Sequence, residues 1–294
     1  MTLPSVIRQP GSRAPDRIVA VEGLGQAFTF ELEPGLLLLE AVCKGFAEAG
    51  FESGVLELRD VALSEFAYVM PALSKTPANA AFYSDVFKPA GITRITSGAI
   101  TFGRREGAPF FHCHAVWHEM ANQESEAKLS GGHVLPDGSI ISERVSVTAL
   151  GLDGMVFEAV PDPEVNFTLF RPVVSKETNT NAKTRVVALR LRPNQDFTGA
   201  LEAFCALNSI RRARIRGGVG STIGAHFDDG RIVPNFATEV FIRDGVVAPG
   251  REGALQARIN VALVDYTGAV DQGCLLRGRN PVLMTFELVL EVLE

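Results

Sequence analysis

The sequence predicts an α/β protein that consists of two similar domains in tandem. The same order of segments occurs twice: an alternating, strand-like stretch, a proline, an amphipathic stretch that suits a helix, and then β-rich sequence led by a glycine. A polar segment that is poor in large apolar residues separates the two occurrences. We therefore expect a first domain over residues 16–173, a linker over 174–184 and a second domain over 185–294.

The repeat can be followed along the chain. The strand that ends in Pro34 corresponds to the strand that ends in Pro193, and each is followed by a helical stretch with the pattern Glu-Ala-X-Cys. Gly54 and Gly217 then lead into the apolar sequence. Two later pairs of segments also match: 107–116 with 253–262, and 132–135 with 273–276. Two copies of one domain explain these matches better than chance does.

The composition narrows the class of protein. With 294 residues, of which 46% are hydrophobic, the chain can bury a large core. No run approaches the length of a membrane span and the first residues lack an apolar signal core, so we expect a cytoplasmic protein without membrane contact. The four cysteines have no CxxC spacing, which predicts free thiols. A net charge of −6 without a Lys/Arg run offers no evident footprint for DNA phosphates.

Four of the five histidines lie between residues 108 and 135, and three of them predict a metal site. His112 and His114 belong to an apolar, β-prone run, so their side chains share one face of a strand at a Cβ separation of about 6.6 Å. Two imidazoles at that spacing can converge on one ion through bonds of about 2.0–2.1 Å. His133, in a Gly-Gly-His segment, supplies a third ligand if residues 119–128 form a hairpin loop.

The other residues of this strand have different expected places. Phe111, Cys113, Ala115 and Trp117 have the opposite parity and are expected in the core, so Cys113 is not a ligand. His118 has the parity of the ligands but lies at the strand end, where a rim position is expected. The alternative for the histidines is that they satisfy hydrogen bonds or pack at a subunit interface.

The second copy differs at the three ligand positions, where it has Arg258, Asn260 and Cys274. Arginine stays protonated and does not ligate a metal, so this copy is expected to be free of metal. It either serves only packing and assembly, or Arg258 and Asn260 bind a carboxylate or phosphate. In the first copy, Glu57 could turn toward the histidines as a fourth ligand or base, although solvation at the surface is the alternative. Residues 217–222 lack the ending of a phosphate loop and are expected to form a tight connection between strands.

Residues 25–150 resemble the PPC domain, which is named for plants and prokaryotes. The resemblance rests on the strand, proline and helix, on residues 54–63 and 91–100, and on the HxH of 109–116 followed by the Gly-Gly-His of 131–135. The second copy resembles a divergent member. This resemblance implies an antiparallel-rich sheet with a packed helix, and association into trimers.

The resemblance also bears on function. Some prokaryotic members resemble acetolactate decarboxylase in fold and hold a metal on histidines, which map to His112, His114 and His133. Plant members carry an AT-hook for DNA, and this sequence has none. We therefore expect a trimeric protein with a divalent metal, zinc above others, that acts on or binds a small oxygen-rich metabolite as a hydrolase or lyase. A DNA-binding regulator and an oligomeric scaffold are the alternatives.

Overall fold

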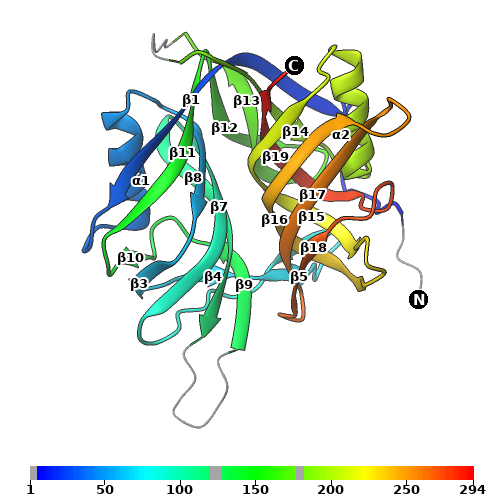
Figure 1. Ribbon diagram of the computed structural model, residues 1–294. Helices are drawn as coiled ribbons and strands as arrows, with labels where there is room; N and C mark the ends of the chain where they lie inside the picture. The colour runs from blue at the N-terminus through cyan, green and yellow to red at the C-terminus, as the bar shows by residue number, and fades with distance from the viewer. Residues whose placement is uncertain (1–4, 120–127, 177–181) are drawn as a thin grey trace.

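The computed structural model describes residues 5–119, 128–176 and 182–294 (Figure 1). The expected hairpin loop after the histidine strand and the middle of the expected linker lie outside these residues. The first half of the chain contains β1 (Ile18–Leu32), α1 (Leu38–Glu48), β2 (Gly54–Leu58), β3 (Val61–Glu65), β4 (Tyr68–Val69), β5 (Pro71–Leu73), β6 (Ala81–Tyr83), β7 (Thr93–Arg105), β8 (Ala108–Glu119), β9 (Lys128–Val134), β10 (Ile140–Ile141) and β11 (Val145–Asp153).

A hairpin and a second set of elements follow. The hairpin is formed by β12 (Met155–Asp162) and β13 (Phe167–Val174). The second half then contains β14 (Thr184–Leu191), α2 (Phe197–Leu207), β15 (Ala213–His226), β16 (Ile232–Pro249), β17 (Leu255–Asp265), β18 (Val270–Cys274) and β19 (Val282–Val292). Within the described residues, all strand pairs are antiparallel except β7 with β12. The expected antiparallel-rich sheet with a packed helix is confirmed, and the α/β label holds only in the loose sense that helices and strands occur together.

Strands pair in the same order in the two halves. In the first half the order is β1-β11-β2-β7-β8-β9. In the second half it is β14-β19-β15-β16-β17-β18. The long strand β1 also pairs with β14, which joins the halves into one continuous sheet. Each helix follows the first strand of its half, and Figure 1 shows α1 and α2 on opposite sides of the molecule.

Each helix packs one apolar stripe on its own sheet. In α1 the buried residues recur with helical spacing, at Leu38, Ala41, Val42, Gly45 and Phe46. The helix α2 begins where the Asp196 carboxylate accepts a hydrogen bond from the Gly199 amide at 2.7 Å, which satisfies one free amide of the first turn. Neither helix is long and apolar enough to cross a bilayer, and no other described segment forms such a helix.

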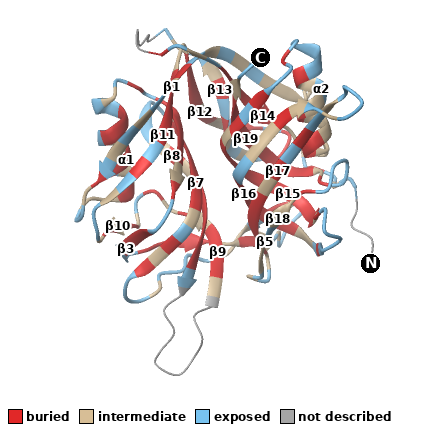
Figure 2. Cartoon of the chain, viewed as in Figure 1, coloured by how far each residue is buried: buried red, intermediate tan, exposed pale blue. Residues whose placement is uncertain are grey.

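The two halves face each other across a shared apolar interface. Apart from the separate cores beneath α1 and α2, one buried cluster combines residues of both halves and the hairpin, among them Val55, Phe157 and Val289. A second cluster joins Val116 of β8 to Phe241 of β16. Figure 2 shows buried residues along the strands where the halves meet. Side chains on these inner faces are therefore shielded from solvent although they belong to sheet surfaces.

One local expectation was wrong. Residues 217–222 are not a tight connection between strands, because they lie inside β15. Gly217 and Gly218 have φ values of +56° and +128° where the pairing with β19 shifts register, so they form a bulge that bends the strand. The strand continues past this bulge through Ser221, which lines the cavity described below.

Candidate metal centre

Three histidines converge on the inner face of β8 and β9. His112 and His114 alternate with Phe111 and Cys113, both of which are fully buried in the core as expected. His133 is the register partner of His114 on the neighbouring strand. One ligand nitrogen from each of the three imidazoles lies within 4.8 Å of the others, so the group could hold a metal ion.

The Gly-Gly pair before His133 has a steric role. A Cβ atom on Gly132 would lie 2.6 Å from the Val69 carbonyl oxygen of β4, which is a clash with backbone. Strand β4 pairs with β9 at His133 and Val134, so the missing side chain lets β4 close over this edge of the site. The Gly-Gly-His segment therefore combines one ligand with the close approach of a strand that covers it.

Two of the histidines are oriented by groups from the second half of the chain. Nδ1 of His112 contacts a carboxylate oxygen of Glu287 on β19, whose side chain is completely buried. Nδ1 of His114 lies 3.0 Å from the carbonyl oxygen of Val240 on β16, an acceptor only, so this nitrogen carries the proton and donates it. Such outer partners fix the tautomer and leave Nε2 free to ligate.

The inner nitrogens suit a cation. Nε2 of His112 and Nε2 of His114 are 3.0 Å apart, and with both Nδ1 atoms protonated they present lone pairs to each other. Nδ1 of His133 is also buried and has no hydrogen-bond partner within the described residues. An ion between these nitrogens removes the lone-pair repulsion and satisfies the orphaned atom, so the donor set fits a metal that prefers imidazole.

Burial keeps the site in the form that binds metal. Loss of solvent lowers the pKa of His114 well below its usual value, and the neighbouring histidines lower it further. The pKa of His133 falls for the same reasons, desolvation first and His112 second. Neutral imidazoles at physiological pH have a lone pair available for a metal ion.

A buried carboxyl group lies next to the histidines. Oε1 of Glu239, on β16, is 3.8 Å from Nε2 of His114, and the other carboxyl oxygen has no hydrogen-bond partner. Desolvation raises the pKa of Glu239 well above its usual value. Tyr83 packs its ring on His133 with centroids 5.2 Å apart, and burial followed by the charges of Glu239 and Glu287 raises the pKa of its phenol. Burial thus favours the protonated form of both groups.

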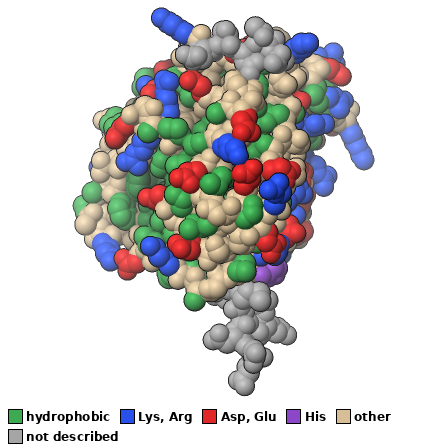
Figure 3. Space-filling model, turned by 90° about the vertical axis from the view of Figure 1, so that its left-hand side faces the viewer, with side chains coloured by type: hydrophobic (Ala, Val, Ile, Leu, Met, Phe, Trp, Pro, Cys, Tyr) green, Lys and Arg blue, Asp and Glu red, His purple; other side chains and the backbone are tan. Residues whose placement is uncertain are grey.

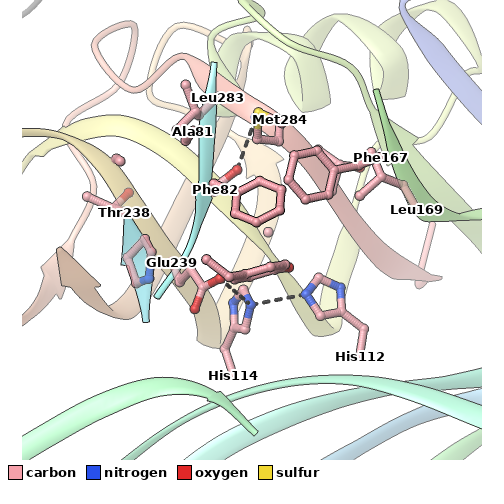
Figure 4. Close-up of a pocket in the computed structure, with 16 residues that line it drawn as sticks. Ala81, Phe82, His112, His114, Phe167, Leu169, Thr238, Glu239, Leu283 and Met284 are labelled. Atoms are coloured by element: carbon pink, nitrogen blue, oxygen red, sulfur yellow. Dashed lines mark hydrogen bonds and ion pairs between the residues drawn. The ribbon is translucent and has the colours of Figure 1, made fainter. Parts of the chain in front are cut away.

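His112, His114 and Glu239 form one end of a cavity of about 50 Å³. Figure 4 shows His112, His114 and Glu239 on one side, and Phe82, Phe167 and Met284 on the other. The walls come from both halves and from β6 and β13, and most of them are apolar. Phe82 is 51% exposed, so this wall of the cavity reaches the surface of the molecule.

A network of buried charges lies behind Glu287. Its register partner on β14 is Arg190, which is 1% exposed. Arg190 forms an ion pair with Asp162 at the end of β12 at 2.7 Å and donates to the Thr285 hydroxyl at 3.1 Å. Arg192 shares the same carboxylate at 2.5 Å. The acid that contacts His112 therefore lies beside a buried cluster of two arginines and one aspartate, and the positive charge of Arg190 is on the neighbouring strand.

The other sequence candidates lie away from this centre. Glu57 shares its row of the sheet with His114, two strands away, but forms an ion pair with Arg59 at 3.1 Å and is 38% exposed. His118 is exposed at the rim, as expected. Arg258 is exposed, and the Asn260 amide donates to Asp244 at 2.7 Å, which places a carboxylate beside the expected anion pocket.

The predicted correspondence of ligand positions agrees with the strand register. His114 is opposite His133, and Asn260 is opposite Cys274 at the matching position of the second half. Glu239 and Glu287 were not found from the sequence. Their only signal there is that each is the single acid of a mostly apolar stretch, residues 236–242 and 282–290, and a buried charge needs a partner.

Comparison with known proteins finds a family model that matches part of the chain. Residues 178–294 match the family model of the Plants and Prokaryotes Conserved (PCC) domain. This is the half that the sequence analysis expected to be the divergent member, whereas the motif resemblance was assigned to residues 25–150. A search of curated proteins finds no match to the chain.

Several solved structures are similar to about half of the chain. One is a metal-containing protein from Archaeoglobus fulgidus, with 18% identity, a TM-score of 0.41, and coverage of 52% of this chain and 98% of that one. A plant- and prokaryote-conserved protein from Pyrococcus horikoshii has 20% identity, a TM-score of 0.39, and coverage of 53% and 97%. A protein from Ralstonia eutropha JMP134, named as a candidate DNA-binding protein, has 14% identity, a TM-score of 0.38, and coverage of 49% of this chain and 89% of that one. These values are too low to transfer a function to this chain.

Proposed function

We propose that the protein binds one divalent metal ion, zinc above others, through His112, His114 and His133, and that it binds or transforms a small metabolite beside this ion. The observation that carries the proposal is the pair of Nε2 atoms at 3.0 Å, each facing inward because its Nδ1 is engaged by the second half. Three protein ligands leave a coordination position open, which is the pattern of catalytic rather than structural zinc.

The chain's own groups support chemistry at this position. A bound divalent ion would supply a Lewis acid that polarises a carbonyl or lowers the pKa of water. The carboxyl group of Glu239 lines the same cavity, with one oxygen that has no hydrogen-bond partner, so it is placed to exchange a proton with a ligand. The protonated phenol of Tyr83 lines the cavity as a hydrogen-bond donor, and the apolar walls exclude bulk water. A hydrolase and a decarboxylase are both compatible with these groups.

We further propose that residues 16–173 and 185–294 are two copies of one domain, and that the chain associates into trimers. The matching order of strand pairing in the two halves supports the first statement. The trimer follows only from the family resemblance of the sequence. Residues of a single chain supply both the histidines and the carboxyl groups of the site described above.

Metal analysis of untagged protein tests the proposal. We expect about one equivalent of a transition metal per chain, and loss of most of it in the variant His112→Ala/His114→Ala, because a single remaining imidazole binds weakly. His118→Ala is the matched control, since this exposed histidine lies on the same strand. Full metal content in the double variant would overturn the proposal.

DNA binding is the alternative class of function. Across the middle of the face in Figure 3, basic and acidic side chains alternate and do not gather into a basic patch. With a net charge of −6, the chain can neutralise few phosphates. We expect only weak duplex binding that disappears as the salt concentration rises, and a tight, sequence-selective shift in a gel at physiological salt would favour this alternative instead.

A further inference from the structure

We infer that residues 70–84 form an arm that opens to admit the metal ion and its ligand to the histidines and then closes over them. The inference rests on the proposed function, because it concerns access to that site. Neither the histidine motif nor the family match covers this segment, which lies in the first half of the chain between β4 and β7.

The arm is a separate hairpin that is anchored at one end. Its strands β5 and β6 pair with each other and form a two-stranded sheet apart from the large one. At the base, Tyr68 pairs with Val134 of β9 and exchanges two backbone hydrogen bonds with Phe87, at 2.9 and 3.1 Å. The Met70 amide then donates to the Ser84 hydroxyl at 2.9 Å, which joins the two sides where the arm begins. Beyond this point the arm is free of the ladder of the large sheet.

The arm forms one wall of the cavity beside the histidines. Figure 4 shows Phe82 on the opposite side of the cavity from His114. The ring centroids of Phe82 and Phe167 are 5.5 Å apart, and those of Tyr83 and His133 are 5.2 Å apart. Four residues of β5 and β6 line the cavity: Pro71, Ala81, Phe82 and Tyr83. The closed arm therefore covers both the cavity and one of the histidines.

The cavity is small while the arm is closed. A water molecule needs about 10–15 Å³ of such space, so a cavity of about 50 Å³ holds roughly three to five waters. Pockets for drug-sized ligands measure about 300–1,000 Å³. A metabolite of more than a few heavy atoms therefore requires one wall to move. The other walls are strands of the large sheet, so the arm is the wall that can move without breaking that sheet.

The tip of the arm is held by three hydrogen bonds to the turn between β12 and β13, which we call the latch. The Asn79 side-chain amide donates to the carbonyl oxygens of Val165, at 3.3 Å, and of Asn166, at 3.0 Å. The Asn166 side-chain amide donates back to the Ala78 carbonyl oxygen at 3.2 Å. Residues 75–78 of the tip are exposed, so water competes for these bonds. Segments that open locally have few buried contacts and exposed hydrogen bonds of this kind.

Metal-exchange kinetics test the arm as a gate. An ion that must pass the arm enters and leaves through the open state, so weakening the latch raises both rates by the same factor and leaves the affinity unchanged. Asn79→Ala removes two latch bonds. Asn166→Gly removes the third and suits the backbone, because Asn166 has a φ of +57°. One hydrogen bond is equivalent to a factor of about 2–10, so we expect zinc association and dissociation each to accelerate at least about threefold in both variants.

The control variant is Lys75→Ala, at an exposed position of the same tip that is outside the latch. Its two rates should equal those of wild type in stopped-flow experiments with zinc and a chromophoric chelator. A substitution that merely loosens the site accelerates dissociation alone and weakens the affinity. Unchanged rates in both latch variants would overturn the inference, and so would faster dissociation without faster association.

Hydrogen exchange separates this inference from the proposed function. In metal-free protein, amides of residues 70–84 should exchange faster in Asn79→Ala than in wild type, whereas amides of β8 should not. If the protein holds no metal, the proposed function fails and exchange alone decides about the arm, with equal exchange in the two proteins counting against it. If zinc binds but exchange and both rates are unchanged, the proposed function stands and the arm is not a gate.

Discussion

Glu287 provides the sharpest test of how the second half of the chain supports the metal centre. Its carboxylate contacts Nδ1 of His112 and is completely buried. Outer partners of this kind contribute a factor of about 10–100 to metal affinity, or about 1.4–2.8 kcal/mol. In Glu287→Gln the amide oxygen can still accept the hydrogen bond, but the charge is lost, and hydrogen bonds to charged groups are about twice as strong as neutral ones.

We therefore expect a graded loss of zinc affinity, about tenfold in Glu287→Gln and about a hundredfold in Glu287→Ala. The alanine variant removes the acceptor of His112 altogether, so the imidazole is free to rotate. Competition against a chromophoric chelator at neutral pH measures both constants. Because a loss of affinity could also follow from general loosening of β19, circular dichroism should confirm that each variant is folded.

The matched control is Glu291→Gln on the same strand. Its carboxylate bonds to Arg216 at 3.0 Å and is 16% exposed, so it resembles Glu287 in charge and pairing but does not contact a histidine. Zinc affinity within twofold of wild type in Glu287→Ala would refute the reasoning, and so would an equal loss in Glu291→Gln.

Three further predictions concern stability and assembly. The folded-state pKa of His114 and of His133 is lowered, so metal-free protein should lose unfolding free energy as the pH falls below about 6.5. The loss should reach up to about 1.4 kcal/mol per pH unit for each histidine. Urea melts measure it, and an unfolding free energy that does not change with pH would contradict this prediction. Asp162→Asn should cost about 3–5 kcal/mol in the same assay because it leaves a buried arginine unpaired, whereas Glu22→Gln, in an exposed pair, should cost less than about 1 kcal/mol. Light scattering should give about three times the chain mass of 31.6 kDa, and a mass near one chain would refute oligomerisation.

Glu239 should change the unfolding free energy with pH in the opposite direction to the histidines. Its folded-state pKa is raised, so the stability that it contributes is present at acidic pH and is lost as the pH rises through that pKa. Glu239→Gln should therefore stabilise metal-free protein at about pH 8 more than at about pH 5. Thermal melts at the two pH values measure the difference, and a larger gain at the lower pH would contradict the assignment.

Local sequence patterns predicted the elements that carry the histidines. The parity of residues 111–117 separates ligands from core because side chains of a strand alternate between its two faces, and the structure has this alternation. The repeated order of strand, proline and helix likewise predicted two similar sets of elements, because capping and periodicity act within short stretches. The correspondence of Asn260 and Cys274 with His114 and His133 was visible for the same reason.

The groups that surround the histidines depend on contacts between residues far apart in the chain, which the sequence did not predict. Glu287 is 175 positions from His112, and the Val240 carbonyl is 126 positions from His114, so no local pattern links them. Glu57, which was considered as a fourth ligand or base with surface solvation as the alternative, is 38% exposed and paired with Arg59. The sequence by itself determined which side chains could bind a metal, through residue type and strand parity. Only the tertiary structure decided which carboxyl groups face them and how small the adjoining cavity is, because those properties arise where the two halves of the sheet pack together.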